Sequence, residues 1–447
     1  MISANKHKEK IIMDISAIVL AAEDGSRMKS NKPKAMCGVL GDPMIDWVLD
    51  SIAGAGIPAE NTAVIGDDTI SKYISDKSEA YFTFPQVKNA VEALGGDILV
   101  IRSDAVFADD ETIKAALNAH RESGNDVTVI SAVLPDPARF DRIIRAEDGS
   151  LEAVKAFKDC TLPQLGITEV SAGICWIKAD ALAGITDISR VSDIAAAVGK
   201  AGVFRADDHD IVLGADSRAE MLNLNIIAKM RVIAKHLNNG VEFVSTDGVI
   251  IGRNVEIGRD TCILPGTILR GKTVIGESCT LGPNTLIENC KIGDGVTLNS
   301  VQAYDSRVCD RVKAGPFVQL RPGTVLHEGV KIGDFVEVKN SEIGVNTAIA
   351  HLTYVGDSDV GKGVNFGCGC VTANYDGINK YRTKIGDYAF IGCNTNLIAP
   401  VEIGENATTA AGSTITKSVP PDSLAVERAQ TKIIDNWEKN FLRKKKA

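Results

Sequence analysis

The spacing of hydrophobic residues differs between the two halves of the chain. Before residue 240, short aliphatic runs are separated by longer amphipathic segments. The runs at residues 15–20, 63–65 and 97–101 predict buried strands, and residues 110–120 predict a helix. Strands and helices that follow one another in this way are typical of an α/β domain.

One long helix is predicted at the end of this first half, from residue 216 to residue 237. Apolar residues at helical spacing form a stripe along it, made of Leu222, Ile226, Met230, Ile233 and Leu237. Gly240 follows and predicts the end of the helix. We expect this helix to link two domains.

In the second half, an aliphatic or aromatic residue followed by glycine recurs at spacings near multiples of six. The glycines from Gly252 to Gly293 lie 6, 18, 6 and 11 residues apart, and those from Gly333 to Gly404 lie 11, 17, 6, 19, 6 and 12 apart. Six residues fit one flat face of a triangular β-coil, in which the aliphatic residue points inward and glycine provides the backbone angles of the turn. A glycine-rich sandwich would instead have turns about every 8–12 residues.

Composition narrows the class of protein. The 447 residues suffice for two or three domains, and 45% hydrophobic with 24% charged residues excludes a disordered chain. The net charge of −9 argues against a general binder of nucleic acid or membrane surfaces. Because no apolar run approaches the roughly 18–20 residues of a membrane helix, we expect a cytoplasmic protein.

The number and spacing of the cysteines and histidines indicate whether disulfides or metal sites are to be expected. Ten cysteines include no C-x-x-C pair, which indicates reduced thiols in small positions rather than a disulfide framework. Only six histidines are present, and this limits metal chemistry.

A glycine-containing, basic loop follows the strand predicted at residues 15–20. Its sequence is Leu20-Ala-Ala-Glu23-Asp24-Gly25-Ser26-Arg27-Met28, followed by Pro33-Lys34. Backbone amides and basic side chains at such a place can cradle nucleotide phosphates. Glu23 and Asp24 oppose this, because like charges about 4 Å apart cost about 1–4 kcal/mol.

The loop resembles the signature of sugar-nucleotide pyrophosphorylases, in which glycine stands at position 23 and threonine at position 26. With the repeats included, residues 14–440 resemble the bifunctional family of N-acetylglucosamine-1-phosphate uridyltransferase/glucosamine-1-phosphate N-acetyltransferase. The resemblance implies a Rossmann-like nucleotidyltransferase domain followed by a left-handed parallel β-helix, and a homotrimer with active sites between subunits. The expected divisions are an N-terminal extension (1–13), the α/β domain (14–215), a linker helix (216–240), the β-helix (241–430) and a basic tail (431–447).

The N-terminal half departs from this family at its binding motifs. The family's G-T-G-H-A aligns with Gln86-Val-Lys-Asn-Ala90, and its Y-G-D with Arg102-Ser-Asp104. Asp141 replaces the glycine of Y-G-R-I, and Ala156 and Ser171 replace a sugar-contacting glutamate and asparagine.

The resemblance assigns roles to four residues that this half keeps or alters conservatively. Arg27 and Lys34 would contact nucleotide phosphates, and Asp104 and Asp216 would bind Mg²⁺. The losses imply an inactive nucleotidyltransferase, with a rebuilt pocket of shifted specificity as the alternative.

The C-terminal half keeps the family's motifs in order: Gly315-Pro-Phe-Val-Gln-Leu-Arg321-Pro-Gly323, Phe335-Val-Glu337-Val-Lys339-Asn340, His351-Leu-Thr-Tyr354-Val-Gly-Asp357 and Asn374-Tyr375-Asp376-Gly377. Acetylation of a sugar amine needs a base, donors for the thioester oxyanion and cations for the sugar phosphate. By resemblance His351 is the base and Glu337 orients its ring. Arg321, Lys339 and Lys380 would hold phosphate and sugar oxygens. The sugar pocket would be completed by Tyr354, Asn365, Asn374 and Tyr375, the last two also contacting acetyl-CoA.

Acetyl-CoA is the co-substrate that the resemblance implies, and it would lie along the coil near Cys393, Ala411 and Arg428. Cys393 replaces a serine of the family, and a thiol donates hydrogen bonds only weakly. The basic residues 443–446 are expected to be a solvated end of the chain.

Three other functions remain to be compared with this one. The chain could be fully bifunctional, or it could be a non-catalytic trimeric scaffold. The third, a hexapeptide-repeat carbonic anhydrase, is excluded, because it would need about three histidines for each zinc and the repeat half has only His327 and His351.

Overall fold

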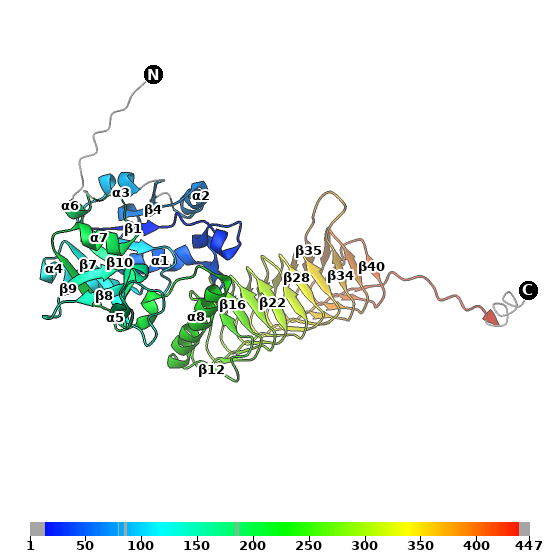
Figure 1. Cartoon of the computed structure of the whole chain (residues 1–447). Helices are drawn as coiled ribbons and strands as arrows, with labels where there is room; N and C mark the ends of the chain where they lie inside the picture. Colours follow the sequence, from blue (N-terminus) through cyan, green and yellow to red (C-terminus); the bar gives the residue numbers. More distant parts are fainter. Residues whose placement is uncertain (1–13, 79, 85–86, 184, 186, 438–447) are drawn as a thin grey trace, which may run out of the picture. The chain divides into compact units, whose positions relative to one another are not determined.

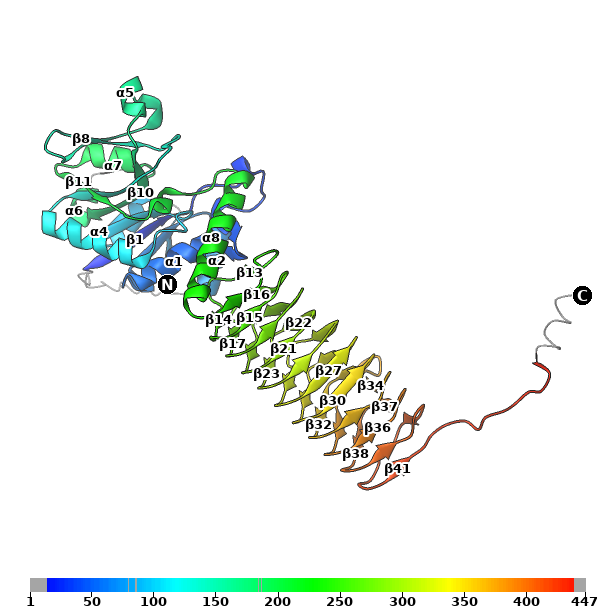
Figure 2. The same ribbon diagram turned by 90° about the horizontal axis from the view of Figure 1, so that it is seen from below.

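The structure is a computed structural model that describes residues 14–78, 80–84, 87–183, 185 and 187–437. It divides into two compact units, residues 1–228 and 229–447. The first unit contains helices packed around a sheet, and the second is a long coil of short strands (Figures 1 and 2).

A mixed sheet of nine strands forms the centre of the first unit in its described part. Its strands are β1 (Ile15–Leu20), β4 (Thr62–Ile65), β5 (Phe82–Phe84), β6 (Asp97–Arg102), β7 (Val127–Val133), β8 (Arg142–Arg145), β9 (Leu151–Lys155), β10 (Glu169–Lys178) and β11 (Ala201–Arg205). The order is β11-β7-β10-β6-β1-β4-β5, with β8 and β9 joined to β10. Strands β4 and β6 flank β1 in parallel, whereas β10 is antiparallel to β6 and β7. The three predicted strands are confirmed as β1, β4 and β6.

Both faces of this sheet are covered, as expected of buried parallel strands. Side chains of β1 alternate between two hydrophobic clusters, with Val19 packed on the side of Leu49 and Ile18 on the side of Leu182. The predicted helix at residues 110–120 is confirmed as α4. The helices of this unit are α1 (Met44–Gly54), α2 (Asp68–Lys77), α3 (Val87–Ala93), α4 (Asp110–Ser123), α5 (Leu162–Leu165), α6 (Ala179–Leu182) and α7 (Val191–Ala197).

The long helix is present as α8 (Arg218–Asn238), which begins and ends within two residues of the predicted bounds. Its predicted apolar stripe is mostly exposed: Leu222, Ile226, Met230 and Leu237 are 51–63% exposed, and only Ile233 is buried. The face that α8 buries carries Met221, Leu224, Ala228, Val232 and Ile233 instead. The helix has two apolar rows, and periodicity alone did not identify the buried one.

The second unit is a parallel β-helix with three faces. Every third strand joins the same sheet up to β40, and β41 then pairs with β39, which gives 11, 10 and 9 strands on the first, second and third face. The first face has β12 (Glu242–Phe243), β15 (Cys262–Ile263), β18 (Thr280–Leu281), β21 (Thr297–Leu298), β24 (Lys313–Ala314), β27 (Lys331–Asp334), β30 (Ala348–His351), β33 (Asn365–Phe366), β36 (Phe390–Ile391), β39 (Thr408–Thr409) and β41 (Leu424–Ala425). The second has β13 (Ile250–Ile251), β16 (Ile268–Arg270), β19 (Leu286–Glu288), β22 (Val301–Tyr304), β25 (Val318–Leu320), β28 (Glu337–Lys339), β31 (Tyr354–Gly356), β34 (Val371–Ala373), β37 (Asn396–Ile398) and β40 (Thr414–Ile415). The third has β14 (Glu256–Ile257), β17 (Val274–Ile275), β20 (Lys291–Ile292), β23 (Arg307–Val308), β26 (Val325–Leu326), β29 (Glu342–Ile343), β32 (Ser358–Val360), β35 (Thr383–Ile385) and β38 (Val401–Ile403).

The predicted period of six is visible in the core of this unit. Seven aliphatic residues at intervals of six point inward and are at most 8% exposed: Ile251, Ile257, Ile263, Leu269, Ile275, Leu281 and Ile287. Burying each of them contributes about 1.5–3 kcal/mol, so the aliphatic ladder holds the coil together.

Most glycines that follow an aliphatic residue of this row have a different role from the one expected. Gly258, for example, is not among the glycines with positive φ. A Cβ on it would lie 2.6 Å from the carbonyl carbon of Gly276 in the next coil, so glycine is needed there because successive coils approach closely. Gly282, which follows Leu281, is the exception in this row: its φ is 109°, so it does provide the backbone angles of a turn.

All ten cysteines are free, as predicted, and five of them are buried. Burial raises the pKa of Cys175 to about 12, which keeps that thiol protonated and unreactive.

Among the described residues, none of the helices combines the length and the apolar character needed to cross a bilayer.

Candidate functional site

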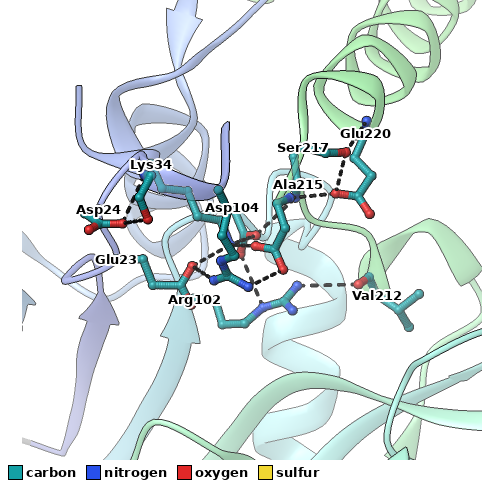
Figure 3. A network of polar contacts seen from close by, with 12 residues as sticks. Glu23, Asp24, Lys34, Arg102, Asp104, Val212, Ala215, Ser217 and Glu220 are labelled. Carbon is teal, nitrogen blue, oxygen red and sulfur yellow. Dashed lines mark hydrogen bonds and ion pairs between the residues drawn. The ribbon is translucent and has the colours of Figure 1, made fainter. Parts of the chain in front are cut away.

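Charged side chains from three segments meet at the carboxyl edge of the sheet in the first unit (Figure 3). Glu23 and Lys34 follow β1, Asp104 follows β6, and Asp216 precedes α8. Because β1 and β6 are parallel neighbours, the segments that follow them lie side by side. These four residues line a cavity of about 790 Å³.

Lys34 is surrounded by three carboxylates. Its Nζ lies 2.8 Å from Glu23 Oε2, 2.7 Å from Asp104 Oδ2 and 2.8 Å from Asp216 Oδ1. An ammonium group has three hydrogens, so each one has a carboxylate acceptor. Burial lowers the pKa of Lys34, but the three carboxylates outweigh it and raise that pKa above its usual value. Burial raises the pKa of Asp104, but Arg102 and Lys34 outweigh it and lower that pKa.

Arg27 is held by two of the same carboxylates. Its Nη2 donates to Glu23 Oε2 at 2.8 Å, and its Nη1 donates to Asp216 Oδ2 at 2.7 Å. Glu23 Oε2 therefore accepts from both Arg27 and Lys34. Both cations predicted to contact nucleotide phosphates are thus paired with carboxylates of the chain itself.

Asp24 lies outside this network, because its Oδ1 accepts the backbone N–H of Ser26 at 3.0 Å. Gly25 remains essential to the loop: a Cβ on it would lie 2.2 Å from the carbonyl oxygen of Lys32. The loop therefore keeps its tight backbone, although it has gained two acidic side chains.

Asp104 and Asp216 are the predicted Mg²⁺ ligands, and carboxylates are the right ligand type. Their oxygens do converge on one point, but Lys34 Nζ lies there. Asp104 also accepts the N–H of Ala215 at 3.2 Å and lies 3.3 Å from Arg102 Nε. Because an ammonium group and a metal ion exclude one another at the same point, this arrangement does not fit Mg²⁺.

On the β-helix, five residues form a column at the end of the first face: Asp334, His351, Cys368, Cys393 and Ala411. For each member after Asp334, the residue that follows it in the sequence donates its backbone N–H to the carbonyl oxygen of the preceding member of the column. These bonds are Leu352 to Asp334 (2.9 Å), Gly369 to His351 (3.2 Å), Asn394 to Cys368 (2.7 Å) and Gly412 to Cys393 (2.8 Å). Neighbouring strands lie about 4.8 Å apart, so His351 and Ala411 are separated by about 15 Å along the column.

This column joins the predicted base to the predicted acetyl-CoA residues. Arg428 lies close to its far end, since a Cβ on Gly412 would be 3.8 Å from Arg428 Cδ. Cys368 was not singled out from the sequence. A signal for it existed: Cys368 follows Phe366-Gly367 as Cys393 follows Ile391-Gly392, so the two occupy equivalent repeat positions.

Most of the predicted sugar-binding residues gather on the second face. Arg321 donates its backbone N–H to Val338 at 2.8 Å, which places it level with Lys339 on the next coil. Tyr354 pairs in register with Glu337, and Gly356 leaves room for its ring: a Cβ there would lie 2.3 Å from Tyr354 Oη.

The expected contact between Glu337 and His351 is not made within one chain. The Glu337 carboxylate instead lies 2.7 Å from Arg321 Nη1, and the exposed His351 ring has no hydrogen-bond partner among the described residues. The reason is their placement, because Glu337 projects from the second face and His351 ends a strand of the first.

Within the described part of the chain, Asn365, Tyr375 and Lys380 form no hydrogen bond or ion pair with Arg321, Lys339 or Tyr354. Asn365 begins β33 on the first face. Tyr375 and Lys380 bridge one another in the loop between β34 and β35, which projects from the prism (Figure 1). We therefore expect a site that uses them with Arg321 and Lys339 to involve another copy of the chain or a movement of the loop.

Comparison with known proteins decides the family. Residues 17–147 match the MobA-like NTP transferase domain, and residues 382–417 match the bacterial transferase hexapeptide (six repeats). The Bifunctional protein GlmU of Acetivibrio thermocellus is 38% identical over 97% of this chain and 99% of its own length. The chain belongs to the GlmU family. The GlmU proteins of Geobacillus sp. (strain WCH70) and Caldanaerobacter subterraneus subsp. tengcongensis are 37% and 38% identical over 94% and 96% of this chain, and 97% and 99% of their own lengths.

Membership in the GlmU family agrees with the predicted fold class, a Rossmann-like nucleotidyltransferase domain followed by a left-handed parallel β-helix of hexapeptide repeats. The structure shows where most of the residues lie that differ from the family's motifs in the N-terminal half. Asp141 and Ser171 line the cavity of Lys34, and Ala156 is buried. Arg102 points toward the same cavity, with its Nη2 donating to Val212 O at 3.4 Å. Gln86 lies outside the described residues, and α3 begins at the next residue.

Asp357 is a further residue of the GlmU β-helix to which the sequence analysis assigned no role. It is 4% exposed, and it accepts from Asn340 Nδ2 at 2.6 Å and from Asn374 Nδ2. Lys339 Nζ lies 3.5 Å away. Burial raises the pKa of Asp357, but these three partners outweigh it and lower that pKa below its usual 3.8. Asp357 therefore fixes two predicted site residues, Lys339 and Asn374.

Replacing Asp357 with alanine is expected to lower the free energy of unfolding by about 2–4 kcal/mol, because buried amide donors lose their acceptor. Urea denaturation followed by circular dichroism measures the change. Asp359→Ala is the matched control, since Asp359 pairs with Arg382 at the surface and should cost at most about 1 kcal/mol. Equal losses in the two variants would contradict a special role for Asp357. The contribution of this carboxylate should be complete above pH 3.8 and disappear as the pH falls through its lowered pKa.

Proposed function

We propose that the β-helix half transfers the acetyl group of acetyl-CoA to the amine of glucosamine-1-phosphate, as a step of UDP-N-acetylglucosamine synthesis. The column from His351 through Cys368 and Cys393 to Ala411 is the observation that supports this most strongly. Acetyl-CoA lying along the column, with Arg428 near its phosphates, would bring its thioester to His351. A cytoplasmic location follows from the use of acetyl-CoA.

The chemistry follows from the groups near the column. The amine nitrogen of the sugar attacks the thioester carbonyl carbon, and the His351 imidazole removes the amine proton. The carbon–sulfur bond then breaks, and coenzyme A leaves as a thiolate that takes up the proton. Arg321 and Lys339 on the second face would hold the sugar phosphate, and Tyr354 the sugar. Cys393 offers a weaker hydrogen bond than a serine would.

The site is proposed to lie between the subunits of a homotrimer. Phe317, Phe335 and Leu352 occupy the corner between the first and second faces on three successive coils, and each is 58–60% exposed. The rings of Phe317 and Phe335 stack with centroids 5.1 Å apart. An exposed apolar corner of this kind suits contact with a second copy, and the loop with Tyr375 and Lys380 would then complete a neighbouring site.

The N-terminal unit is proposed not to transfer uridylyl groups. The support is the pairing of Lys34 with three carboxylates, together with the altered motifs around the same cavity. The alternative is the full bifunctional activity that the names of the relatives describe. The nucleotidyltransferase-like domain would cover residues 14–215, the linker 216–240 and the acetyltransferase 241–430.

Two assays on the purified full chain test this division. Acetyl-CoA with glucosamine-1-phosphate should give N-acetylglucosamine-1-phosphate, detected by mass spectrometry. UTP with N-acetylglucosamine-1-phosphate and Mg²⁺ should give no pyrophosphate. Pyrophosphate release in the second assay would establish the bifunctional alternative. No product in the first would favour the non-catalytic scaffold.

A further inference from the structure

We propose that Glu23 excludes polyphosphates from the N-terminal site by occupying, with its own carboxylate, the cations that a triphosphate would need. This inference rests on the proposed function, in which this half does not transfer uridylyl groups, and it names the residue responsible. The ligand class that Glu23 keeps out is a nucleoside triphosphate or free polyphosphate.

The carboxylate of Glu23 makes the contacts that a phosphate oxygen of a bound ligand would make. One atom, Oε2, accepts from Arg27 Nη2 and from Lys34 Nζ, both at 2.8 Å. Arg27 and Lys34 are the two residues of the loop that the family resemblance assigns to nucleotide phosphates. A phosphate oxygen that bridged them would have to take the position of Glu23 Oε2.

Lys34 has no donor left for a ligand. Its other two hydrogens are directed at Asp104 and Asp216, at 2.7 and 2.8 Å. The side chain of Lys34 is only 9% exposed, so its ammonium group has little room to turn toward solvent. The side chain of Glu23 is 54% exposed. The side chain of Asp216 is 47% exposed and that of Asp104 only 3%. A ligand could therefore displace Glu23 or Asp216 but not Asp104, and Glu23 is the one that bridges Arg27 and Lys34 through a single oxygen.

The charge balance is consistent with this role. The charged side chains that line the cavity are five cations and five carboxylates: Arg27, Lys34, Arg102, Arg139 and Arg190, and Glu23, Asp104, Asp141, Asp216 and Glu220. Removing the Glu23 carboxylate leaves a net positive charge around the cavity. With Glu23 present, an incoming triphosphate meets a neutral cluster and a carboxylate that repels it at close range.

The experiment measures binding of inorganic triphosphate by isothermal titration calorimetry at fixed ionic strength, without Mg²⁺. It compares the full wild-type chain with Glu23→Gly and Glu23→Gln. Both variants are expected to bind about 10- to 1,000-fold more tightly than wild type, since each tenfold step corresponds to about 1.4 kcal/mol of removed repulsion. Glu23→Gln removes the charge and keeps the bulk, so it separates electrostatic from steric exclusion.

Asp24→Asn is the matched control. It removes the same charge one residue away, but Asp24 bonds to Ser26 and does not touch Lys34. Its affinity for triphosphate should stay within about threefold of wild type at 0.15 M salt. An equal gain in Asp24→Asn would reduce the effect to general charge and overturn the role of Glu23. The double variant Glu23→Gly/Lys34→Met should lose the gain, because the freed cation is gone.

The outcomes separate this inference from the proposed function. If wild type already binds triphosphate as tightly as Glu23→Gly and releases pyrophosphate from UTP, the proposed function fails. If wild type is inert and the folded Glu23 variants gain no affinity, only the role of Glu23 fails. Thermal melting and circular dichroism establish folding, and Glu23→Gln is nearly isosteric, so at least one variant should remain folded.

Discussion

Replacing His351 with alanine is expected to lower the rate of acetyl transfer about 10²–10⁴-fold, while acetyl-CoA binding and assembly stay unchanged. The sugar amine is not nucleophilic until it loses a proton, and His351 is the histidine in the column that leads to Ala411. The ring is exposed and has no hydrogen-bond partner among the described residues, so its loss should not disturb the coil. Product formation is followed by mass spectrometry and acetyl-CoA affinity by calorimetry.

His327→Ala is the control for this prediction. His327 lies on the same β-helix but pairs with Glu342, with Nε2 and Oε1 2.6 Å apart, and it stands outside the column. Its removal should leave the rate unchanged. Wild-type turnover in His351→Ala, or an equal loss in His327→Ala, would remove the assignment of His351 as base.

The fold could be predicted from short sequence patterns, because each of these patterns is compatible with only one kind of secondary structure. A period of six cannot form a helix, and it matches the inward row from Ile251 to Ile287. The apolar runs that predicted β1, β4 and β6 lie in the buried centre of their sheet, where both faces are covered. The stripe of α8 shows where this approach ends. Leu222 and Leu224 are equally hydrophobic, and only packing decides that Leu224 is buried.

The sites could be predicted only in part, because they join residues that are distant in the sequence. The sequence placed two carboxylates near the phosphate loop, but it did not show that Glu23 would meet Lys34 together with Asp104 and Asp216. On the β-helix, the residue types indicated the chemistry. The hydrogen-bond and ion-pair partners of each residue, however, depend on how the coils stack. Arg321 lies level with the strand of Glu337 and pairs with it, so Glu337 does not reach His351 within one chain.

Phe335→Asp is expected to convert the proposed homotrimer to monomers and to abolish most acetyl transfer. Phe317, Phe335 and Leu352 have φ of 57°, 57° and 48°, a region that costs a residue with a side chain about 1–2 kcal/mol. Positive φ recurs at other turns of the coil, for example at Asn284 and Arg311, so the backbone alone does not mark a contact surface. The exposed apolar side chains at this corner are what suit contact with a second copy. Burying one phenylalanine contributes about 1.5–3 kcal/mol, and the trimer would bury three copies of Phe335, so a charge there should shift assembly by well over tenfold. Sedimentation velocity measures the mass.

Activity should fall with assembly, because among the described residues Tyr375 and Lys380 form no hydrogen bond or ion pair with Arg321 or Lys339 of their own chain. Val274→Asp is the control, since Val274 is 40% exposed on the third face, away from this corner. It should leave both mass and rate unchanged. A monomeric Phe335→Asp variant with full activity would show that one chain builds the whole site, and Lys380 would then have to reach Arg321 by movement of its own loop. Mixing inactive His351→Ala with inactive Lys380→Ala chains distinguishes the two arrangements: recovered activity requires that the two residues of one site come from different copies.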